Sequence, residues 1–301
     1  AAGGRVVTAA GERVPYDGLL LATGARPFVP PVPGLEARPP VHVLRTAEEA
    51  ESLLRAARQA RSALVMGGGL LGLEAARSLS RLGLQVTVIE AAPHLLPRQL
   101  DGRAAEILRS RLEAMGLSFA LGRQVQQVAP AGAAGGVAVT LQGGQTISSD
   151  LMLVASGVRS RVELAAAAGC AVERGVVVDD RLATTVSGIY AAGDVAQHRG
   201  IVYGIWPPAM QQGRAAGAAM VGKEAAYGGS VRSHQLKVAG IDLVSLGDLD
   251  LRGEGEEEVV EDRAAGIYRR LVRKDGRLRG AILLGDISGF RDLEKQIAQG
   301  G

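Results

Sequence analysis

The strongest constraint on the fold of this 301-residue chain is a run of glycines between two apolar segments. Residues 63–66 are apolar, the next residues read Gly-Gly-Gly-Leu-Leu-Gly, and residues 70–82 carry apolar side chains at helical spacing. Residues 85–90 form a second apolar segment that ends in Glu90. Two strands joined by a crossover helix are parallel neighbours in one sheet, so this stretch predicts a βαβ unit.

The glycine run fits the pattern G-x-G-x-x-G, which binds a dinucleotide when it follows a strand and opens a helix. Gly67 would allow the tight turn, Gly69 would let the backbone approach a pyrophosphate, and Gly72 would let helix and strand pack closely. Free amides and the positive dipole at the helix N-terminus favour phosphate. The sequence therefore predicts an NAD(H) site whose turn is formed by Gly67, Gly68, Gly69, Leu70, Leu71 and Gly72.

Two carboxylates belong to this predicted site. Glu90 lies about 20 residues beyond the turn, where a carboxylate accepts hydrogen bonds from both ribose hydroxyls and repels a 2′-phosphate, so we expect NADH rather than NADPH. Glu74 is expected in the first helical turn, where the helix dipole favours a carboxylate that faces the nicotinamide. The alternatives are a solvated Glu90 beside an ordinary glycine-rich turn, and a Glu74 that only stabilises the helix start.

The length suggests about two or three domains, and a composition of 47% hydrophobic and 22% charged residues with 42 glycines is typical of a globular α/β protein. Pro27, Pro30, Pro31 and Pro33 forbid regular structure and predict a connector between domains. Strands are predicted over residues 5–8, 13–22, 118–121, 125–128, 137–141, 146–149, 151–155, 175–179 and 188–192, and helices over residues 46–59, 103–115 and 208–221. The final third predicts a separate α+β unit, with strand-like residues 235–246, 259–262, 266–273 and 277–284 and a helix over residues 289–298.

Composition also excludes several classes of protein and site. The net charge of +3 comes from scattered arginines without a basic stripe and interleaved aromatics, which argues against nucleic acid as a partner. No apolar run reaches the ~18 residues of a membrane span, so we expect a soluble protein. The single Cys170 excludes an intrachain disulfide and a thiolate cluster; we interpret it as a small buried hydrophobe and expect a reducing cytoplasm.

The four histidines, His42, His94, His198 and His234, are far apart and lack ligand-like spacing. We therefore expect them at the surface or in caps, and we expect no metal site. Residues 254–258 are mostly glutamate and are expected to form a solvated acidic loop.

Three further segments resemble those of the FAD-dependent pyridine nucleotide oxidoreductases, the family of disulfide reductases, NADH oxidases and rubredoxin reductases. Residues 20–27 read LLATGARP and resemble the ATG segment at the crossing from flavin domain to NAD domain. Residues 153–159 read LVASGVR and resemble its second copy at the return crossing, with Ser156 where Thr is usual. Residues 188–196 read GIYAAGDVA and are similar to the segment whose aspartate binds the ribityl and phosphate region of FAD.

The resemblance implies that FAD binds beside NAD(H). It implies that Glu74 is a catalytic residue on the nicotinamide side, and that Trp206 and Pro207 approach the isoalloxazine at a helix N-terminus, whose amide dipole stabilises the anionic reduced flavin. The other residues that it assigns to cofactor binding are Ala22, Thr23, Gly24, Ser156, Gly157, Gly193 and Asp194. From the residues alone, Gly193-Asp194 is also typical of a turn or cap, and Trp206 of a buried core.

The final third resembles the C-terminal domain of NADH:rubredoxin reductases and of the flavoprotein part of assimilatory nitrite reductase large subunits, through residues 236–242 and 268–286. Such proteins pass electrons to rubredoxin or an iron–sulfur centre without a redox cysteine pair. The resemblance thus implies a protein electron acceptor. An acidic electron carrier that docks near the hairpin Asp275-Gly276 would be such an acceptor. The alternative is a solvated hairpin face. The basic residues concerned are Arg269, Arg270, Arg273, Lys274, Arg277 and Arg279.

One departure from the family pattern concerns the N-terminal part. The family begins with a flavin-binding βαβ unit ahead of the first ATG segment, and residues 1–26 are too few to build it. Three explanations are open: the unit has been removed, it belongs to a partner chain that completes the FAD site, or the protein has abandoned FAD. Asp194 and the two ATG-like segments favour the first two explanations.

The expected fold is α/β, with a Rossmann-like NAD domain (residues 27–158) inserted in a partial FAD domain (residues 1–26 and 159–226) and followed by a small α+β C-terminal domain (residues 227–301). The expected function is transfer of hydride from NADH to FAD and of electrons on to rubredoxin or an iron–sulfur protein, in a homo-oligomer. The alternative is a flavin-free NAD-binding subunit that regulates or scaffolds a redox complex.

Overall fold

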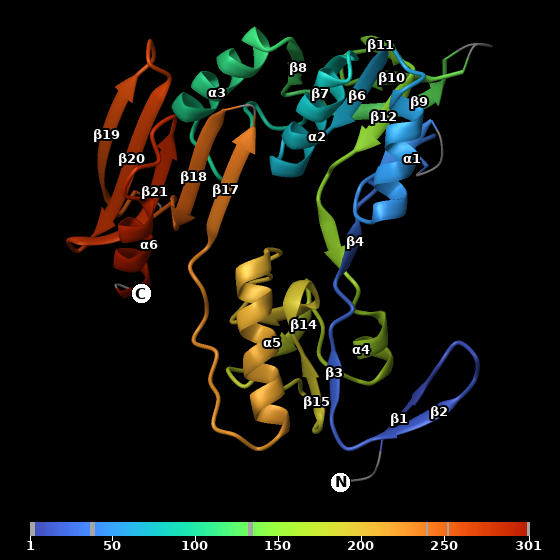
Figure 1. Ribbon diagram of the computed structural model, residues 1–301, viewed down its shortest axis with the longest axis vertical. Helices are drawn as coiled ribbons and strands as arrows, with labels where there is room; N and C mark the ends of the chain where they lie inside the picture. The colour runs from blue at the N-terminus through green and yellow to red at the C-terminus, as the bar shows by residue number, and fades with distance from the viewer. Residues whose placement is uncertain (1–3, 37–39, 132–134, 239, 252, 300–301) are drawn as a thin grey trace. The chain divides into compact units, whose positions relative to one another are not determined.

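The computed structural model describes residues 4–36, 40–131, 135–238, 240–251 and 253–299. By its internal contacts the chain forms a first unit of Ala1–Arg26 and Val158–Ser230, and a second unit of Pro27–Gly157 and Val231–Gly301. The backbone therefore passes between the units three times, after Arg26, after Gly157 and after Ser230. Figure 1 labels the elements in chain order.

A five-stranded parallel sheet forms the centre of the second unit. Its strands lie in the order β5 (Val41–Val43), β12 (Leu151–Val154), β6 (Ser62–Met66), β7 (Gln85–Glu90) and β8 (Leu117–Leu121). Parallel neighbours need crossovers, and α2 (Leu70–Arg81) joins β6 to β7 while α3 (Gly102–Ala114) joins β7 to β8. The βαβ unit predicted over residues 63–90 is confirmed.

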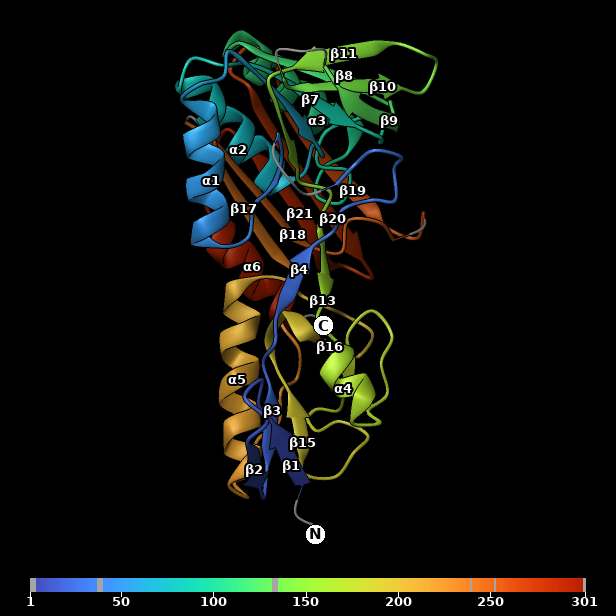
Figure 2. The ribbon, with the colours of Figure 1, turned by 90° about the vertical axis from the view of Figure 1, so that its right-hand side faces the viewer.

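Both faces of this sheet are covered. Val65 of β6 packs in one core with Leu73 of α2, whereas its neighbour Leu64 packs in another core with Val139. Val139 belongs to an antiparallel sheet of β9 (Val125–Pro130), β10 (Val137–Leu141) and β11 (Thr146–Ser149), which lies together with β8 at the top of Figure 2. Burial on both faces explains why β6 is apolar throughout instead of alternating with polar residues.

The C-terminal part of the second unit is an antiparallel sheet. Its strands lie in the order β17 (Ser233–Val238), β18 (Ile241–Gly247), β21 (Arg277–Leu284), β20 (Ile267–Lys274) and β19 (Glu256–Asp262). One face packs on α6 (Phe290–Gln299) through Leu283 and Leu293. The other face shares the core of α2 and α3, since Leu243 and Tyr268 lie in the same cluster as Leu108.

The first unit is built from short strands. A hairpin of β1 (Gly4–Val7) and β2 (Arg13–Tyr16) precedes two parallel pairs, β3 (Leu19–Leu21) with β15 (Ile189–Ala191), and β14 (Val176–Val178) with β16 (Ala196–His198). The helix α5 (Trp206–Met220) lies beside β15 in both views, and α4 (Glu163–Ala167) is a short helix. The strands β4 (Ala25–Pro27) and β13 (Val158–Ser160) pair at the first two crossings.

Several expected elements differ from those observed. Residues 13–22 form two strands, because Asp17 and Gly18 turn the chain, and the segment 235–246 is part of a hairpin whose turn contains Gly240 at φ +81°. Ala239 lies outside the described residues. The strands β4, β5 and β13 and the helix α4 were not expected; they have only three to five residues, too few to show a period. The helix α5 begins two residues earlier than residue 208, at Trp206.

The acidic segment 254–258 was expected to be a loop, and this is wrong for its second half. Glu256, Glu257 and Glu258 lie in the edge strand β19, where cross-strand partners on β20 include basic residues. Cys170 is buried, as expected. Over the described residues, no helix combines the length and the apolar character that a membrane crossing requires.

Candidate functional site

The glycine turn between β6 and α2 is closed so tightly that two of its positions admit only glycine. Gly67 has φ +121°, and a Cβ there would lie 2.4 Å from the carbonyl oxygen of Ala155. A Cβ on Gly72 would lie 2.0 Å from the carbonyl oxygen of Gly67. The turn, the first helical turn and the end of β12 are therefore in backbone contact.

Gly69 is the open position of the turn. It is the N-cap of α2, no side chain caps the helix there, and no atom lies within 4 Å of where its Cβ would be. The N-terminal amides of a helix have no partners within the helix, and they attract anions together with the helix dipole. This uncapped start of a 12-residue helix is thus a suitable site for a pyrophosphate.

Glu90 lies at the end of β7 and holds the backbone of the turn. Its Oε2 accepts a hydrogen bond from the Gly68 amide at 2.7 Å, and its Oε1 accepts one from the Ala92 amide at 2.8 Å. The Gly68 carbonyl in turn accepts a hydrogen bond from the Leu96 amide at 3.0 Å. Leu96 is fully buried with φ +50°, a conformation that costs a non-glycine residue roughly 1–2 kcal/mol. The turn and the loop after β7 are therefore built as one piece.

Ser156 and Gly157 follow β12 at the same edge of the sheet as the glycine turn. The Ser156 hydroxyl donates to the carbonyl oxygen of Met66 at 3.4 Å, directly before the turn. Gly157 has φ +97°, and its carbonyl accepts a hydrogen bond from the Phe28 amide at 2.9 Å. The structure thus brings these two residues together with the glycine turn.

Glu74 lies further along α2 than expected. The helix begins at Leu70, so Glu74 is its fifth residue and the first turn holds no acid. The expected stabilisation of Glu74 by the helix dipole is therefore wrong, because the effect is confined to the first turn. The side chain is exposed, yet desolvation by its surroundings raises the pKa of the Glu74 carboxyl above its usual range.

A second set of the expected site residues gathers in the first unit, at the carboxyl ends of β3 and β15. Leu21 and Ala191 are partners in these parallel strands, so the segment Ala22, Thr23, Gly24 and the pair Gly193, Asp194 leave the sheet side by side. Carboxyl ends of parallel strands are the usual place for ligands in open α/β sheets.

Hydrogen bonds fix both of these loops. The Thr23 hydroxyl donates to the Arg161 carbonyl at 2.8 Å, and the Arg161 amide donates to the Gly24 carbonyl at 2.9 Å. Gly193 has φ +81°, and the Ser160 hydroxyl donates to the Asp194 carbonyl at 2.7 Å. The loop conformations are thus set by neighbouring backbone in the first unit.

The N-terminus of α5 presents an exposed aromatic ring. Trp206 is the first residue of the helix and is 77% exposed, so the alternative of a buried core aromatic is wrong. Pro207 and Pro208 have no amide hydrogens, and the Ala209 amide bonds to the Ile205 carbonyl. Among the described residues, this helix start therefore offers one free donor, the Trp206 amide. A usual helix N-terminus offers more.

Gln212 is a site residue that the sequence reasoning missed. It is 1% exposed, and its Oε1 accepts a hydrogen bond from the Gly193 amide at 2.8 Å. The signal in the sequence is weak: Gln212 is a polar residue in a helix of small residues, on the side that carries the buried Ala216 and Ala219. Gln212 connects α5 to the Gly193 loop.

The histidines were expected at the surface or in caps, which is wrong for two of them. His42 and His198 are buried, and burial lowers the pKa of His42. His198 Nε2 donates a hydrogen bond to the Asp180 carboxylate, and the His198 ring packs against Tyr227. Within the described ranges, no group of three His, Cys, Asp or Glu residues is arranged to hold a metal ion.

The basic residues around the Asp275-Gly276 hairpin do not form one free patch. Arg270 is mostly buried, bonds to Glu257 and lies 3.4 Å from Asp101, and Lys274 pairs with Glu254. Both residues are thus paired with carboxylates of the second unit, Arg270 in a mostly buried position and Lys274 in an exposed one.

The order of these features along the chain matches a known family. A family model described as pyridine nucleotide-disulphide oxidoreductase matches residues 2–213. The chain belongs to the pyridine nucleotide-disulphide oxidoreductase family. Members are FAD-dependent NAD(P)H oxidoreductases. A second model, described as the rubredoxin NAD+ reductase C-terminal domain, matches residues 233–301.

Individual relatives agree with this assignment. The chain is 40% identical over 284 residues to an NAD(P)H nitrite reductase of Bacillus subtilis, covering 94% of this chain and 35% of the relative. It is 40% identical over 204 residues to a rubredoxin-NAD(+) reductase of Pseudomonas putida, covering 67% of this chain and 52% of the relative. A crystal structure of a ferredoxin reductase from Rhodopseudomonas palustris superposes with a TM-score of 0.83 at 29% identity, covering 94% of this chain and 70% of that one. The chain spans 30–36% of the length of the nitrite and nitrate reductase relatives.

Proposed function

We propose that this chain acts in an NADH-dependent flavoprotein reductase that passes electrons to a protein carrying rubredoxin-type iron or an iron–sulfur centre. The observation that carries the proposal is the open, uncapped backbone at Gly69, held between the rigid Glu90 contact and the end of β12. The chemistry of the bound cofactors is hydride donation by NADH and electron storage by FAD.

The second unit supplies the residues that would hold NADH. The amides at Gly69 and the start of α2 would bind the pyrophosphate. Each Glu90 oxygen accepts one backbone amide and keeps a second lone-pair site, so the carboxylate can still accept a ribose hydroxyl. Its negative charge would disfavour the 2′-phosphate of NADPH. Glu74, one turn into the helix, would lie on the nicotinamide side.

The first unit supplies the residues that would hold part of FAD. The loops at Thr23-Gly24 and Gly193-Asp194 end adjacent parallel strands, and the exposed Trp206 offers a flat apolar surface with one free amide. These features fit a flavin, because an exposed Trp with polar loops beside it is what a stacked, hydrogen-bonded ring system requires. The role of these residues is alignment and electrostatics.

The proposed acceptor class rests on the relatives. The relatives include a nitrite reductase, a rubredoxin reductase and a ferredoxin reductase, and the model of the rubredoxin reductase C-terminal domain matches residues 233–301. Transfer to a small iron protein needs no cysteine pair, and this chain has a single, buried cysteine.

Two measurements test the proposal. The intact protein from its native source should show flavin absorption, and a spectrum without it would favour a flavin-free NAD-binding subunit instead. NADH should bind more tightly than NADPH, and Glu90→Ala should weaken NADH by ~1–3 kcal/mol through the lost ribose hydrogen bond. Equal affinity of the unaltered protein for the two nucleotides would contradict the role of Glu90.

A further inference from the structure

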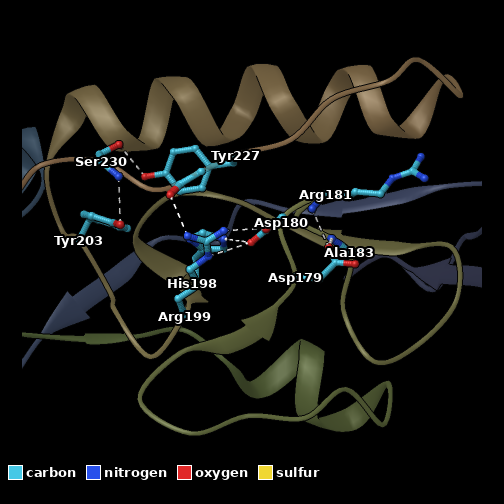
Figure 3. Close-up of polar contacts among 10 residues, drawn as sticks. Asp179, Asp180, Arg181, Ala183, His198, Arg199, Tyr203, Tyr227 and Ser230 are labelled. Atoms are coloured by element: carbon cyan, nitrogen blue, oxygen red, sulfur yellow. Dashed lines mark hydrogen bonds and ion pairs between the residues drawn. The ribbon is translucent and has the colours of Figure 1, made fainter. Parts of the chain in front are cut away.

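The segment that leads from α5 towards β17 is fastened to the first unit by a cluster of polar side chains. We name this cluster the clasp and define it by Asp180, His198, Arg199, Tyr203, Tyr227 and Ser230, all in the first unit. Figure 3 shows these side chains converging on the stretch after α5. The clasp contains none of the proposed nucleotide-binding residues, and Tyr227 contacts Gln212, which bonds to the Gly193 loop.

Asp180 is the centre of the clasp. Its carboxylate accepts hydrogen bonds from Arg199 Nη2 at 2.7 Å and Nε at 3.0 Å, and it lies 2.9 Å from His198 Nε2. The backbone carbonyl of the same residue accepts a hydrogen bond from the Tyr227 amide at 2.7 Å. Asp180 thus joins the loop after β14, the end of β16 and the segment after α5 (Figure 3).

Arg199 has an unfavourable backbone conformation, from which its side chain reaches Asp180. It has φ +48° and precedes Gly200 at φ +78°, in a two-residue turn closed by reciprocal hydrogen bonds between His198 and Ile201 at 3.0 and 2.9 Å. Glycine or asparagine is the usual residue at such a position. Arg199 instead reaches Asp180 and donates from Nη1 to the Gly228 carbonyl at 3.1 Å. The strain is compensated by contacts that only a long guanidinium makes.

Tyr227 and Ser230 are held by further contacts of the clasp. Tyr227 is buried and its ring lies 4.8 Å from that of His198, centre to centre. The Ser230 amide donates to the Tyr203 hydroxyl at 3.1 Å, and the Ser230 hydroxyl lies 2.7 Å from the Tyr227 hydroxyl. His198 Nδ1 is buried without a hydrogen-bond partner among the described residues, which shows that the ring is held by packing and by Asp180.

The next anchor along the chain belongs to the second unit. The Arg232 carbonyl accepts a hydrogen bond from the Gly247 amide at 2.8 Å, and Arg232 Nη2 lies 3.6 Å from Asp248 Oδ1. The boundary between the units falls between Ser230 and Val231. Val231 itself packs against the core of the C-terminal sheet. Ser230, held by the first unit, and Val231, held by the second, are therefore adjacent in the chain.

We propose that the clasp sets the length of the third connection between the two units. When it is closed, no free residue separates Ser230 from Val231. When it is open, the free connection extends back to Glu224, because the Lys223 amide still bonds to the Ala218 carbonyl at the end of α5. Seven residues, 224–230, span up to about 23–25 Å. Opening the clasp thus lengthens the connection that leads to the C-terminal sheet without unfolding a helix or strand of either unit.

Hydrogen exchange of the full chain, read by mass spectrometry over residues 224–231, tests this proposal. Asp180→Asn removes the charge that holds Arg199 and His198, and exchange of the Tyr227 and Ser230 amides should become about tenfold faster, the effect of losing one ordinary hydrogen bond. Exchange in α5 and β14 should not change. The matched control is Glu254→Gln, which removes an exposed ion pair with Lys274 in the second unit and should leave residues 224–231 unaffected.

A second variant guards against simple unfolding of the first unit. Tyr203→Phe removes the hydroxyl that accepts from the Ser230 amide and that also bonds to the Tyr227 hydroxyl. Exchange should therefore rise at the Ser230 amide and rise less at the Tyr227 amide, which keeps the Asp180 carbonyl as its acceptor. The proposal is overturned if neither variant speeds exchange in residues 224–231. It is also overturned if Asp180→Asn speeds exchange equally in β14 and β16, because the contacts would then support the whole unit instead of the connection. Neither readout depends on the proposed cofactors.

Discussion

The carboxylate of Glu90 accepts a hydrogen bond from the backbone amide of Gly68 at 2.7 Å, across the 22 residues that separate the end of β7 from the glycine turn. This contact means that the acid expected to recognise ribose also shapes the loop that is expected to bind pyrophosphate. The two roles of Glu90 can be measured separately, because binding of the ribose needs the nucleotide whereas support of the loop does not.

Glu90→Gln should therefore destabilise the protein even without a nucleotide. Gln keeps the size of the side chain but places an NH2 group against one of the two amides, so roughly 1–3 kcal/mol of unfolding free energy should be lost. Urea unfolding in the absence of nucleotide measures this. Glu106→Gln, which alters an exposed helical pair with Arg109, is the control. Unchanged stability of Glu90→Gln together with weaker NADH binding would show that Glu90 acts on the ribose alone.

Two glycines of the turn form a matched pair for substitution. A Cβ on Gly72 would lie 2.0 Å from the Gly67 carbonyl oxygen, so Gly72→Ala forces backbone movement and should cost about 2–3 kcal/mol of stability. A Cβ on Gly69 meets nothing within 4 Å, so Gly69→Ala should cost little stability and should weaken nucleotide binding by crowding the pyrophosphate. Thermal unfolding and NADH titration of both variants would distinguish them; equal effects on stability would contradict the geometry.

The βαβ unit could be predicted from sequence because its signals are local. Apolar strands, a glycine turn and a helix of regular period all lie within residues 62–90. Gly67 and Gly72 are required by backbone contacts with the end of β12 and within the turn. The first three residues of the edge strand β19, Glu256, Glu257 and Glu258, were mistaken for a loop because glutamates suggest solvent, whereas residues 259–262 were predicted as a strand. Pairing with β20 stabilises β19, and β20 follows in the chain only after a turn.

The clasp residues could not be predicted, for the opposite reason. Asp180 and His198 are 18 residues apart without a period that relates them, and His198 is placed by the two-residue turn that follows it. Gln212 likewise depends on Gly193, which reaches it only after the chain folds. The sequence did not predict the roles of these side chains because tertiary contacts determine them.

Acid should weaken the protein partly through Asp180. The Arg199 guanidinium and His198 hold the pKa of Asp180 at about 2, below its usual 3.8. A carboxyl with a lowered pKa contributes stability that is full above its unfolded pKa and is lost as the pH falls towards 2. The urea midpoint of the unaltered protein should therefore decline more steeply between pH 5 and 2 than that of Asp180→Asn. Parallel declines would show that the carboxylate contributes nothing in the folded state.

Glu74 should have the opposite dependence. Desolvation raises its pKa, so its charged form is disfavoured in the folded protein and stability falls as the pH rises through the raised value. Glu74→Gln removes the charge, so it should match the unaltered protein in acid and be the more stable of the two at neutral pH. Urea unfolding at pH 4 and pH 7.5 measures the difference. A variant that is less stable at pH 7.5 would mean that the carboxylate has a favourable partner in the fold.

The C-terminal sheet is joined to the start of α3 through a buried tyrosine. Tyr268 is 1% exposed, and its hydroxyl donates to Asp101 at 2.6 Å, the same carboxylate that caps α3 through the Ala104 amide at 3.0 Å. Burial and the hydrogen bond to Asp101 raise the pKa of Tyr268. Tyr268→Phe keeps the ring and removes the donor, so about 1–2 kcal/mol of unfolding free energy should be lost.

The loss should also be local. Because Asp101 keeps its bond to Ala104, the start of α3 should stay capped in Tyr268→Phe, whereas Asp101→Ala should lose both contacts and cost more. Hydrogen exchange should rise in β20 for the first variant, and in β20 and the first turn of α3 for the second. If Tyr268→Phe frees α3 as strongly as Asp101→Ala, the tyrosine supports the cap itself, and the sheet and the helix unfold as one element.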